Sequence, residues 1–239
     1  MRLKMVFQLK KPELDMEYRR AILSVLKNSF QQAAAGVYEK FYGDGVPMKP
    51  FTFGVFLPYP KFKDNTIYLS STEITLNFST YFSELGIYFY NSLIGGKRRF
   101  VPYPLPGDNA MTLSRVSLQK ERQVKASTAV FKTLSPFLVR LHHKEDNADE
   151  YLTRANELFV PQMEEHIRVM VEVLLGRKER VEFTPVLLSD GIPIKHYGLF
   201  VDGTTGVFKL TGHPEILDFI YKVGIGSRRS EGFGLLELV

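Results

Sequence analysis

The alternation of apolar and polar residues predicts the first strand of the chain, and a helical pattern follows it. Residues 3–9 alternate with the two-residue period of a half-buried strand. From Tyr18 to Phe30, apolar side chains recur every three or four positions. We therefore predict a helix that Asp15 caps and that Gly36 ends.

Further β-rich and helical stretches complete the first half of the chain. Aromatic and β-branched residues concentrated over 51–56 and 66–78 predict two strands. Apolar residues at helical spacing over 81–94 predict a second helix, which ends at two glycines. We predict another strand over residues 112–124. The expected order is strand, helix, two strands, helix and strand.

The second half of the chain shows a similar order of elements without a residue-level repeat. We predict strands at 131–141, 181–188, 195–201, 206–211 and 235–238. Apolar spacing over 148–176 predicts a long helix that Pro161 should kink or interrupt. A short helix over 214–223 should begin at Pro214 after His213, because proline is well tolerated at the first helical position.

This order of elements predicts an α+β fold built from two split strand-helix-strand units. By analogy with the ferredoxin-like motif, we expect two tandem ferredoxin-like (RRM-like) domains, at residues 1–124 and 125–239. A glycine-rich loop lies in the second domain. The chain has 239 residues, of which 44% are hydrophobic and 24% charged, as in ordinary folded proteins.

The absence of cysteine and the net charge limit which reactions and binding partners are possible. The chain has no cysteine, which excludes disulfides, thiolate metal sites and a cysteine nucleophile, and suits the reducing cytoplasm where we place the protein. We see no apolar run of membrane-spanning length and no signal-peptide pattern, so we expect no membrane partner. The 31 Lys and Arg against 26 Asp and Glu give a net charge of +5, which permits a polyanionic partner without requiring one.

The most informative stretch is a glycine-rich segment between the last predicted helix and the last predicted strand. It reads Gly224-Ile225-Gly226-Ser227-Arg228-Arg229-Ser230-Glu231-Gly232-Phe233-Gly234. Such spacing would let the backbone approach a phosphate chain while two arginines supply positive charge. A strand follows instead of a helix, and the Gly-Lys-Ser/Thr ending of nucleotide-binding loops is absent. A nucleotide-binding enzyme is therefore not expected.

This loop resembles the signature loop of the repeat-associated RNA-binding (RAMP) superfamily of CRISPR systems. Within that superfamily the chain resembles the family of CRISPR-associated protein six, the repeat-cleaving endoribonucleases. Two further segments carry the resemblance, Lys49-Pro50-Phe51-Thr52-Phe53 and Thr133-Leu134-Ser135-Pro136. The resemblance covers nearly the whole chain and implies cleavage of precursor CRISPR RNA without a metal or other cofactor. It implies RNA contacts by the loop residues Gly224, Gly226, Ser227, Arg228, Arg229, Gly232 and Gly234.

The implied reaction is attack by a ribose 2′-hydroxyl on the scissile phosphate, which leaves a 2′,3′-cyclic phosphate and a free 5′-hydroxyl. It needs a base, stabilisation of phosphate charge and in-line positioning. Many family members use a histidine just after the first helix and a lysine a few residues beyond it. Lys49 matches the lysine, but no histidine lies between Gln31 and Phe51. Tyr38 is nearest to the expected position by spacing, and Tyr42 is next.

The two tyrosines can be interpreted in more than one way. As catalytic groups they would orient or deprotonate the attacking hydroxyl, but a tyrosine pKa near 10 requires positive charge nearby, such as Lys40 or Lys49. As structural groups, Tyr38 and Tyr42 would pack along the edge of the helix. Without a base, the chain would be a non-catalytic CRISPR repeat RNA-binding protein, and an engineered inactive chain is a third interpretation. Effector-complex subunits and a second copy of the chain are candidate partners besides the RNA.

A basic cluster after the second predicted helix is another candidate RNA contact. Lys97, Arg98 and Arg99 could contact phosphates, or could instead supply favourable charge at a helix C-terminus. The common aromatic motif that reads single strands is absent, because residues 51–56 lack its basic and glycine positions. Recognition of bases by stacking is therefore less supported than recognition of the backbone or of a stem-loop.

The histidines of the second half offer no obvious catalyst. His142 and His143 adjoin a charged stretch without a third metal ligand at suitable spacing, so we expect a solvated loop and no metal site. His166 should face solvent on the long helix, whereas His196 could reach RNA and His213 fits the start of a helix.

Overall fold

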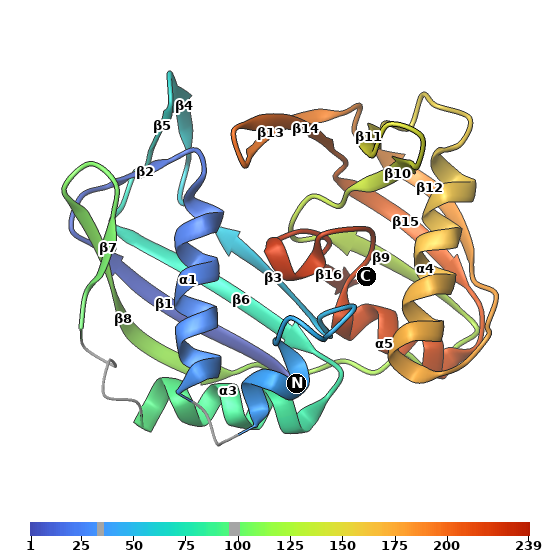
Figure 1. The fold of residues 1–239 in the computed structure, drawn as a ribbon, viewed down its shortest axis with the longest axis horizontal. Coiled ribbons are helices and arrows are strands. Elements are labelled where there is room, and N and C mark those ends of the chain that lie inside the picture. Colours follow the sequence, from blue (N-terminus) through green and yellow to red (C-terminus); the bar gives the residue numbers. More distant parts are fainter. Residues whose placement is uncertain (33–35, 96–100) are drawn as a thin grey trace. The chain divides into compact units, whose positions relative to one another are not determined.

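The computed structural model describes residues 1–32, 36–95 and 101–239 (Figure 1). The chain divides into two compact units, one formed by Met1–Lys49 with Val55–Lys120 and the other by Pro50–Gly54 with Glu121–Val239. The domain limits at residues 124 and 125 stay a prediction from the sequence. None of the helices in the described residues combines the length and apolarity that crossing a bilayer requires.

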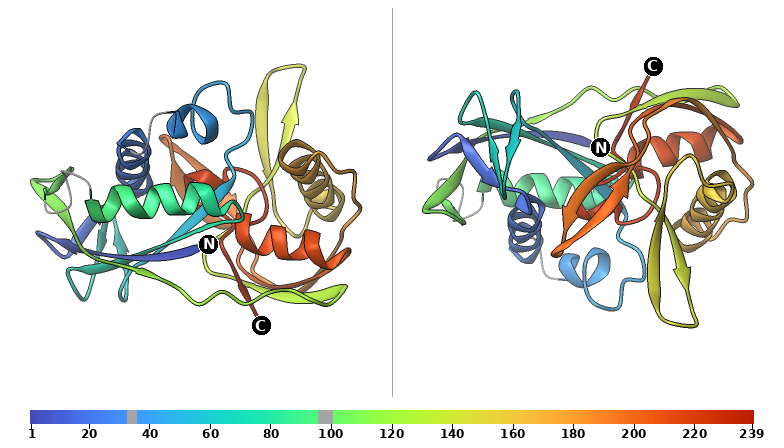
Figure 2. Two further views of the ribbon diagram at one scale, coloured as in Figure 1. Left: turned by 90° about the horizontal axis from the view of Figure 1, so that it is seen from below. Right: turned by 90° about the horizontal axis from the view of Figure 1, so that it is seen from above.

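The first unit is built on a five-stranded sheet with the order β3-β6-β1-β8-β7. Its strands are β1 (Arg2–Leu9), β6 (Glu73–Thr80), β7 (Tyr103–Leu105), β8 (Asn109–Leu118) and β3 (Phe51–Phe56), whose residues up to Gly54 are counted with the second unit. Helix α1 (Tyr18–Gln31) follows β1, and α3 (Ser83–Gly95) follows β6. Both helices lie on one face of the sheet (Figure 2). Chain order and strand order together match a ferredoxin-like unit.

The sequence pattern explains the core of this unit. Leu3, Met5 and Phe7 alternate along β1 and are fully buried, as the two-residue period predicts. Phe30 of α1 stacks on Phe89 of α3 with ring centroids 4.8 Å apart. The unit also contains the short helix α2 (Val37–Phe41) and a small sheet of order β2-β5-β4, with β2 at Glu13–Asp15, β4 at Lys61–Lys63 and β5 at Thr66–Tyr68.

The second unit repeats the arrangement. Its sheet has the order β12-β15-β9-β16, and the recorded strand pairs are antiparallel. The strands are β9 (Thr128–Thr133), β12 (Glu182–Leu188), β15 (Gly206–Thr211) and β16 (Leu236–Leu238), with α4 (Phe159–Leu175) and α5 (Pro214–Val223) between them. Two hairpins are added, β10 (Val139–His143) with β11 (Ala148–Leu152) and β13 (Ile192–His196) with β14 (Leu199–Gly203). The predicted α+β class is confirmed, and α5 has the predicted limits.

Four of the predicted strands are divided or shortened in the structure. The run 66–78 becomes β5 and β6, and 131–141 becomes β9 and β10, where Pro136 has no N–H for a strand ladder. The predicted strand at 195–201 is part of the hairpin β13–β14, which turns at Tyr197 and Gly198 with φ of 49° and 81°. The strand expected at 112–124 ends at Leu118.

The long helix predicted over 148–176 begins only at Phe159. Residues 148–152 form β11 and pair with β10, a tertiary pairing that the apolar spacing does not reveal. Pro161 is consequently the third residue of α4 and lies in its first turn, where a missing N–H breaks no helical hydrogen bond. The helix therefore continues through Pro161, and the expected kink or interruption there is wrong.

The predicted start and stop of the first helix also differ from the structure. Asp15 lies in β2, and its Oδ1 accepts a hydrogen bond from the Glu17 amide at 2.7 Å. Glu17 is the N-cap of α1 and Gln32 is its C-cap. Gly36, expected as the stop, precedes α2 with a φ of 81°.

Candidate functional site

The three residues predicted to act in catalysis gather around α2 of the first unit. Tyr38 lies in α2 and Tyr42 directly follows it, so their rings are on one side of the helical turn, with centroids 5.4 Å apart. The Lys49 ammonium lies 5.0 Å from the centroid of the Tyr42 ring. All three side chains are half-buried. The structure therefore brings together residues that the sequence analysis paired only by spacing.

The positive charge in this cluster belongs to Lys49. Lys40 instead forms an ion pair with Glu84 at 2.5 Å, which offsets its charge. Lys49 has no recorded carboxylate partner among the described residues, and its contact with the Tyr42 ring is a cation–π contact. Tyr42 also packs on Phe30, with ring centroids 5.4 Å apart. The aromatic ring thus positions the lysine ammonium without neutralising it, which leaves its N–H groups able to donate to an anion.

The glycines of the segment 224–234 accommodate the chain itself. A Cβ on Gly234 would overlap the Ile225 carbonyl oxygen, and one on Gly226 would lie 2.6 Å from the Leu138 carbonyl oxygen. Their φ values of +70° and +78° also favour glycine. The Ile225 amide donates to the Gly234 carbonyl at 3.0 Å, which closes the loop. We expected these glycines to open the backbone to a phosphate, but in the structure they allow close packing within the second unit.

The three segments that carry the family resemblance meet in this unit. Thr52 Oγ1 donates to the Phe233 carbonyl at 2.8 Å, and the Leu235 amide donates to Ser135 Oγ at 3.0 Å. Gly224 also faces Thr52, since a Cβ on Gly224 would lie 2.9 Å from the Thr52 Cβ. The loop, residues 50–54 and the segment around Ser135 therefore form one packed structure.

The two arginines of the loop have different environments. Arg228 Nε donates to the Tyr151 hydroxyl at 2.6 Å, and its terminal nitrogens lie 3.4 and 3.5 Å from carboxylate oxygens of Asp149 and Glu231. Arg229 is only 5% exposed and donates to the Val223 carbonyl at 2.9 Å. Burial lowers the pKa of Arg229 to about 10, so it stays charged at neutral pH. Arg228 therefore lies nearer the surface, and Arg229 is not placed for the phosphate contact that we expected.

The hydrogen bonds of Arg228 continue into the interior of the unit through Glu231 and His196. His196 is buried, and its Nε2 lies 2.7 Å from Glu231 Oε2, the oxygen that also faces Arg228. Burial raises the pKa of Glu231, but the hydrogen bond with His196 and the Arg228 charge outweigh it and leave that pKa below its ordinary value. The sequence left open that His196 could reach RNA, whereas in the structure it is buried and supports the loop through Glu231.

Sequence reasoning missed Asp149, Tyr151 and Glu231. Asp149 and Tyr151 were assigned to a helix, and only the pairing of β11 with β10 brings them to Arg228. Glu231 belongs to the glycine-rich segment, but the sequence alone did not indicate that it contacts His196 and Arg228.

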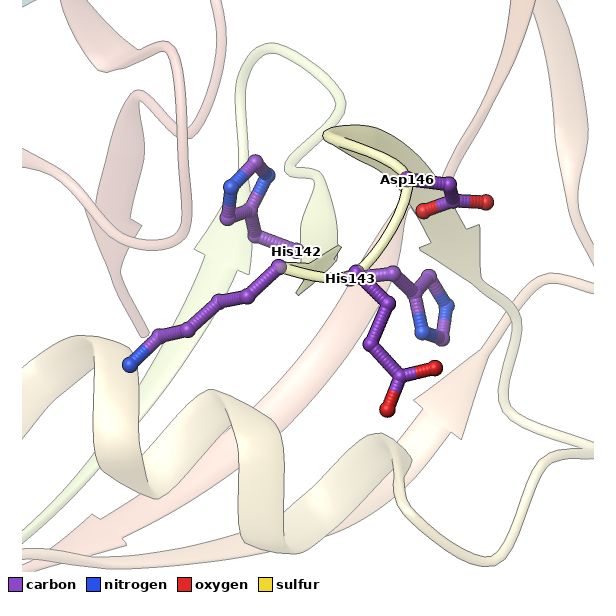
Figure 3. Close-up of a pocket in the computed structure, with 5 residues that line it drawn as sticks. His142, His143 and Asp146 are labelled. Carbon is purple, nitrogen blue, oxygen red and sulfur yellow. The ribbon is translucent and has the colours of Figure 1, made fainter.

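The adjacent histidines lie at the tip of the hairpin β10–β11, beside a hollow formed by residues 142–146 (Figure 3). Each has its own carboxylate: His142 Nδ1 is 2.9 Å from Asp149 Oδ1, and His143 Nε2 is 3.1 Å from Glu150 Oε2. The described residues contain no group of three or more His, Asp or Glu side chains placed to hold a metal ion.

The remaining candidate residues are His166 and the basic cluster at residues 97–99. His166 is half-buried, with Nε2 2.8 Å from the Arg140 carbonyl oxygen, and burial lowers its pKa, so the expectation that it faces solvent is wrong. Lys97, Arg98 and Arg99 lie outside the described residues.

Sequence comparison matches residues 119–238 to the family described as "CRISPR associated protein Cas6, C-terminal". A Pyrococcus furiosus protein, "Putative CRISPR-associated endoribonuclease-like protein Cas6", is 24% identical over 145 residues, which are 56% of this chain and 56% of that protein. A Pyrococcus horikoshii protein, "Putative CRISPR-associated endoribonuclease-like protein Cas6nc", is 29% identical over 120 residues, or 46% of this chain and 48% of that protein. The chain thus spans about half the length of the curated relatives it matches.

Solved structures share the fold of the whole chain. "An RAMP protein binding different RNA substrates" superposes with a TM-score of 0.83 at 19% identity and covers 100% of this chain and 99% of that chain. "Characterization of a Cas6-related gene from Pyrococcus furiosus" describes a structure with a TM-score of 0.81 at 18% identity, covering 100% of this chain and 98% of that chain. At these identities the likeness shows the fold, which confirms the tandem ferredoxin-like prediction.

Proposed function

Because this chain belongs to the Cas6 family of CRISPR-associated proteins, we propose that it binds CRISPR repeat RNA and cleaves precursor CRISPR RNA without a metal ion. The observation that carries the proposal is the cluster of Tyr38, Tyr42 and Lys49. Lys49, which has no carboxylate partner among the residues that the structure describes, contacts the half-buried Tyr42, and Tyr42 in turn contacts Tyr38. The cluster thus combines a charge for phosphate with two hydroxyl groups.

The proposed reaction assigns a role to each of these side chains. The ribose 2′-oxygen attacks phosphorus and the bond from phosphorus to the 5′-oxygen breaks. Solvent water takes the proton of the 2′-hydroxyl and supplies a proton to the leaving 5′-oxygen. Lys49 donates hydrogen bonds to the phosphate oxygens, whose charge grows in the transition state. Tyr38 or Tyr42 accepts a hydrogen bond from the 2′-hydroxyl and orients it. Loss of a strong general base costs about 10²–10⁴ in rate, so we expect slow turnover.

The loop of the second unit supplies part of the proposed RNA-binding surface. Arg228 is the cation nearest the surface there, and its hydrogen bonds to Tyr151, Asp149 and Glu231 hold the guanidinium in place before RNA binds. Ser227, whose amide donates to the Leu138 carbonyl at 2.9 Å, precedes it. Lys97, Arg98 and Arg99 stay proposed contacts.

A second candidate function is repeat RNA binding without cleavage. The observation that favours it is the distribution of histidine, because all five histidines fall within residues 142–213 and none lies in the first 120 residues. In that case the tyrosine cluster would bind RNA without activating the 2′-hydroxyl.

The first prediction is that Lys49→Ala slows cleavage of labelled repeat RNA about 10²-fold or more in excess chelator, while RNA affinity changes only a few-fold. The measurement is a single-turnover time course with mapping of both fragment ends. Lys40→Ala is the matched control, because it removes the same charge nearby from a lysine already paired with Glu84. Tyr38→Phe and Tyr42→Phe remove the hydroxyls and keep the rings.

The result of this experiment distinguishes the endoribonuclease from the non-cleaving RNA-binding protein. A single cut that ends in a cyclic phosphate, slowed by Lys49→Ala and not by Lys40→Ala, supports the endoribonuclease. Tight binding without any cut supports the second candidate, and cleavage unchanged by Lys49→Ala removes that residue from the mechanism.

A further inference from the structure

The segment 56–68 of the first unit exposes large apolar side chains that its core does not use. Phe56 is 64% exposed, Tyr59 84%, Phe62 62% and Tyr68 46%. In the same segment Ile67 is buried, so the core contact is already made by another residue. Single exposed apolar residues are common on protein surfaces, but four exposed aromatic rings in one short segment indicate a binding surface.

The hairpin formed by β4 and β5 organises these side chains, and it projects beyond the main sheet (Figure 1). Lys61 lies opposite Tyr68 in the strand register, and Lys63 lies opposite Thr66. Residues two apart on a strand share a face, so both lysines and Tyr68 are on the same side. The Ser70 amide and hydroxyl both donate to the Pro58 carbonyl, at 3.1 and 3.3 Å, which ties the chain next to Tyr59 to the end of β5.

The hairpin also carries two positively charged side chains, Lys61 and Lys63. Neither Lys61 nor Lys63 has a recorded carboxylate partner in the part of the chain that the structure describes. By contrast, Lys10 and Lys11 of the same unit lie 2.9 and 4.0 Å from a carboxylate oxygen of Asp108. The acidic residues of the small sheet lie on β2, which β5 separates from β4, and Asp64 at the turn is exposed.

We propose that the face of the β4–β5 hairpin that carries Tyr68 and both lysines, together with the neighbouring Tyr59, binds a single-stranded segment of RNA. Aromatic side chains stack on unpaired bases, and neighbouring lysines contact the phosphates between them. A base-paired stem hides the faces of its bases, so it does not fit this surface. The inference deepens the proposed function, because it assigns an unpaired part of the RNA to this hairpin.

This surface differs from the common single-strand motif that the sequence analysis searched for. That motif places its rings on the central strands of a four-stranded sheet, whereas Tyr68 lies on β5 of a separate three-stranded sheet and Tyr59 precedes β4. The alternative role of exposed lysines on an edge strand such as β4 is to prevent pairing with other molecules. The two roles predict different experimental results.

The experiment measures the affinity of the full chain for fluorescent decauridylate and for a base-paired RNA of equal length, at several salt concentrations. We expect Tyr59→Ala and Tyr68→Ala each to weaken decauridylate binding about fivefold or more, with little change for the duplex. Leu118→Ala, which also truncates an exposed apolar side chain of this unit, is the control. The double variant Lys61→Ala/Lys63→Ala should reduce the salt slope by about 1.4.

The matched control for charge is Lys10→Ala/Lys11→Ala, which changes the net charge equally but removes lysines that already face a carboxylate. Equal salt slopes for the two lysine pairs, or unchanged affinity in both ring variants, would overturn the proposal. Self-association of the Lys61/Lys63 variant with unchanged affinity would assign the lysines to edge protection and overturn it as well. Decauridylate contains no repeat sequence, so this result stands apart from whether the chain cleaves its repeat RNA.

Discussion

At the residue scale, the neighbouring arginines of the loop show how backbone conformation separates two identical side chains. Arg228 has a left-handed φ of 51° and immediately precedes the short 3₁₀ helix Arg229–Glu231. The chain turns there, so one guanidinium reaches Tyr151 and Asp149 while the other is buried beside the Val223 carbonyl. The motif Arg-Arg therefore supplies one surface cation and one interior cation.

Glu231 should make the stability of the protein sensitive to acid. Its folded pKa lies below the ordinary value of 4.5, so the carboxylate stabilises the folded state above that pH. This stabilisation is lost as the pH falls from 4.5 through the folded pKa. We expect Glu231→Gln to lower the free energy of unfolding most at neutral pH, with a difference from wild type that shrinks on acidification.

Urea unfolding at a series of pH values tests this prediction. Glu150→Gln is the control, because Glu150 also faces a histidine, at 3.1 Å from His143, but lies exposed on the hairpin. Wild-type and Glu231→Gln stability curves that stay parallel across the acid range would contradict the prediction.

At the scale of elements, the glycine-rich loop is held by close backbone contacts. The Gly234 amide donates to the Pro136 carbonyl at 2.7 Å, and the Ser227 amide donates to the Leu138 carbonyl at 2.9 Å. The loop therefore adds hydrogen bonds to the connection between β9 and β10. Its conformation depends on glycine because a side chain would occupy the space of that connection and of the loop itself.

Gly234→Ala should destabilise the protein by about 2–5 kcal/mol, since the new Cβ adds overlap with the Ile225 carbonyl to the strain of a left-handed residue. Gly198→Ala is the matched control. Gly198 has a similar φ of +81°, but a Cβ there meets no atom within 4 Å, so only about 1–2 kcal/mol of backbone strain is expected. Thermal or urea unfolding measures both variants, and equal losses would show that the overlap is relieved.

At the scale of the whole molecule, the two units are not two consecutive stretches of the chain. Pro50–Gly54 belongs to the second unit, although more than sixty residues of the first unit follow it. Phe51 and Phe53 are fully buried, and Thr52 Oγ1 bonds to the Phe233 carbonyl. The second unit therefore depends on a segment from the first half of the sequence.

Thr52→Val should weaken the second unit more than the first, by about 1 kcal/mol, because it leaves the buried Phe233 carbonyl without this donor. Thr80→Val is its counterpart in the first unit, where Thr80 Oγ1 accepts from the Phe82 amide at 3.2 Å. Amide hydrogen exchange resolved along the chain measures both. We expect faster exchange in β9 and β16 for Thr52→Val and in β1 and β6 for Thr80→Val, and the reverse assignment would contradict the division of the units.

Local sequence was enough to predict much of this fold. The two-residue period of β1, the apolar stripes of α1 and α3, and the proline that starts α5 depend on neighbours within a few positions. Tyr38 and Tyr42 were chosen by their distance from the first helix, but the short helix α2 that brings their rings together was not predicted. Periodicity within an element is a property of the local backbone, so it can be read before the chain folds.

Contacts between distant residues were decided only by tertiary structure. The pairing of β10 with β11 replaced a predicted helical stretch and brought Asp149 and Tyr151 to Arg228. The burial of Arg229 and the bond between Thr52 and Phe233 likewise join segments that local patterns treat separately. The sequence by itself determined the period of most elements and the family motif. Tertiary structure decided which side chains face one another, because strand pairing and packing depend on residues far apart in the chain.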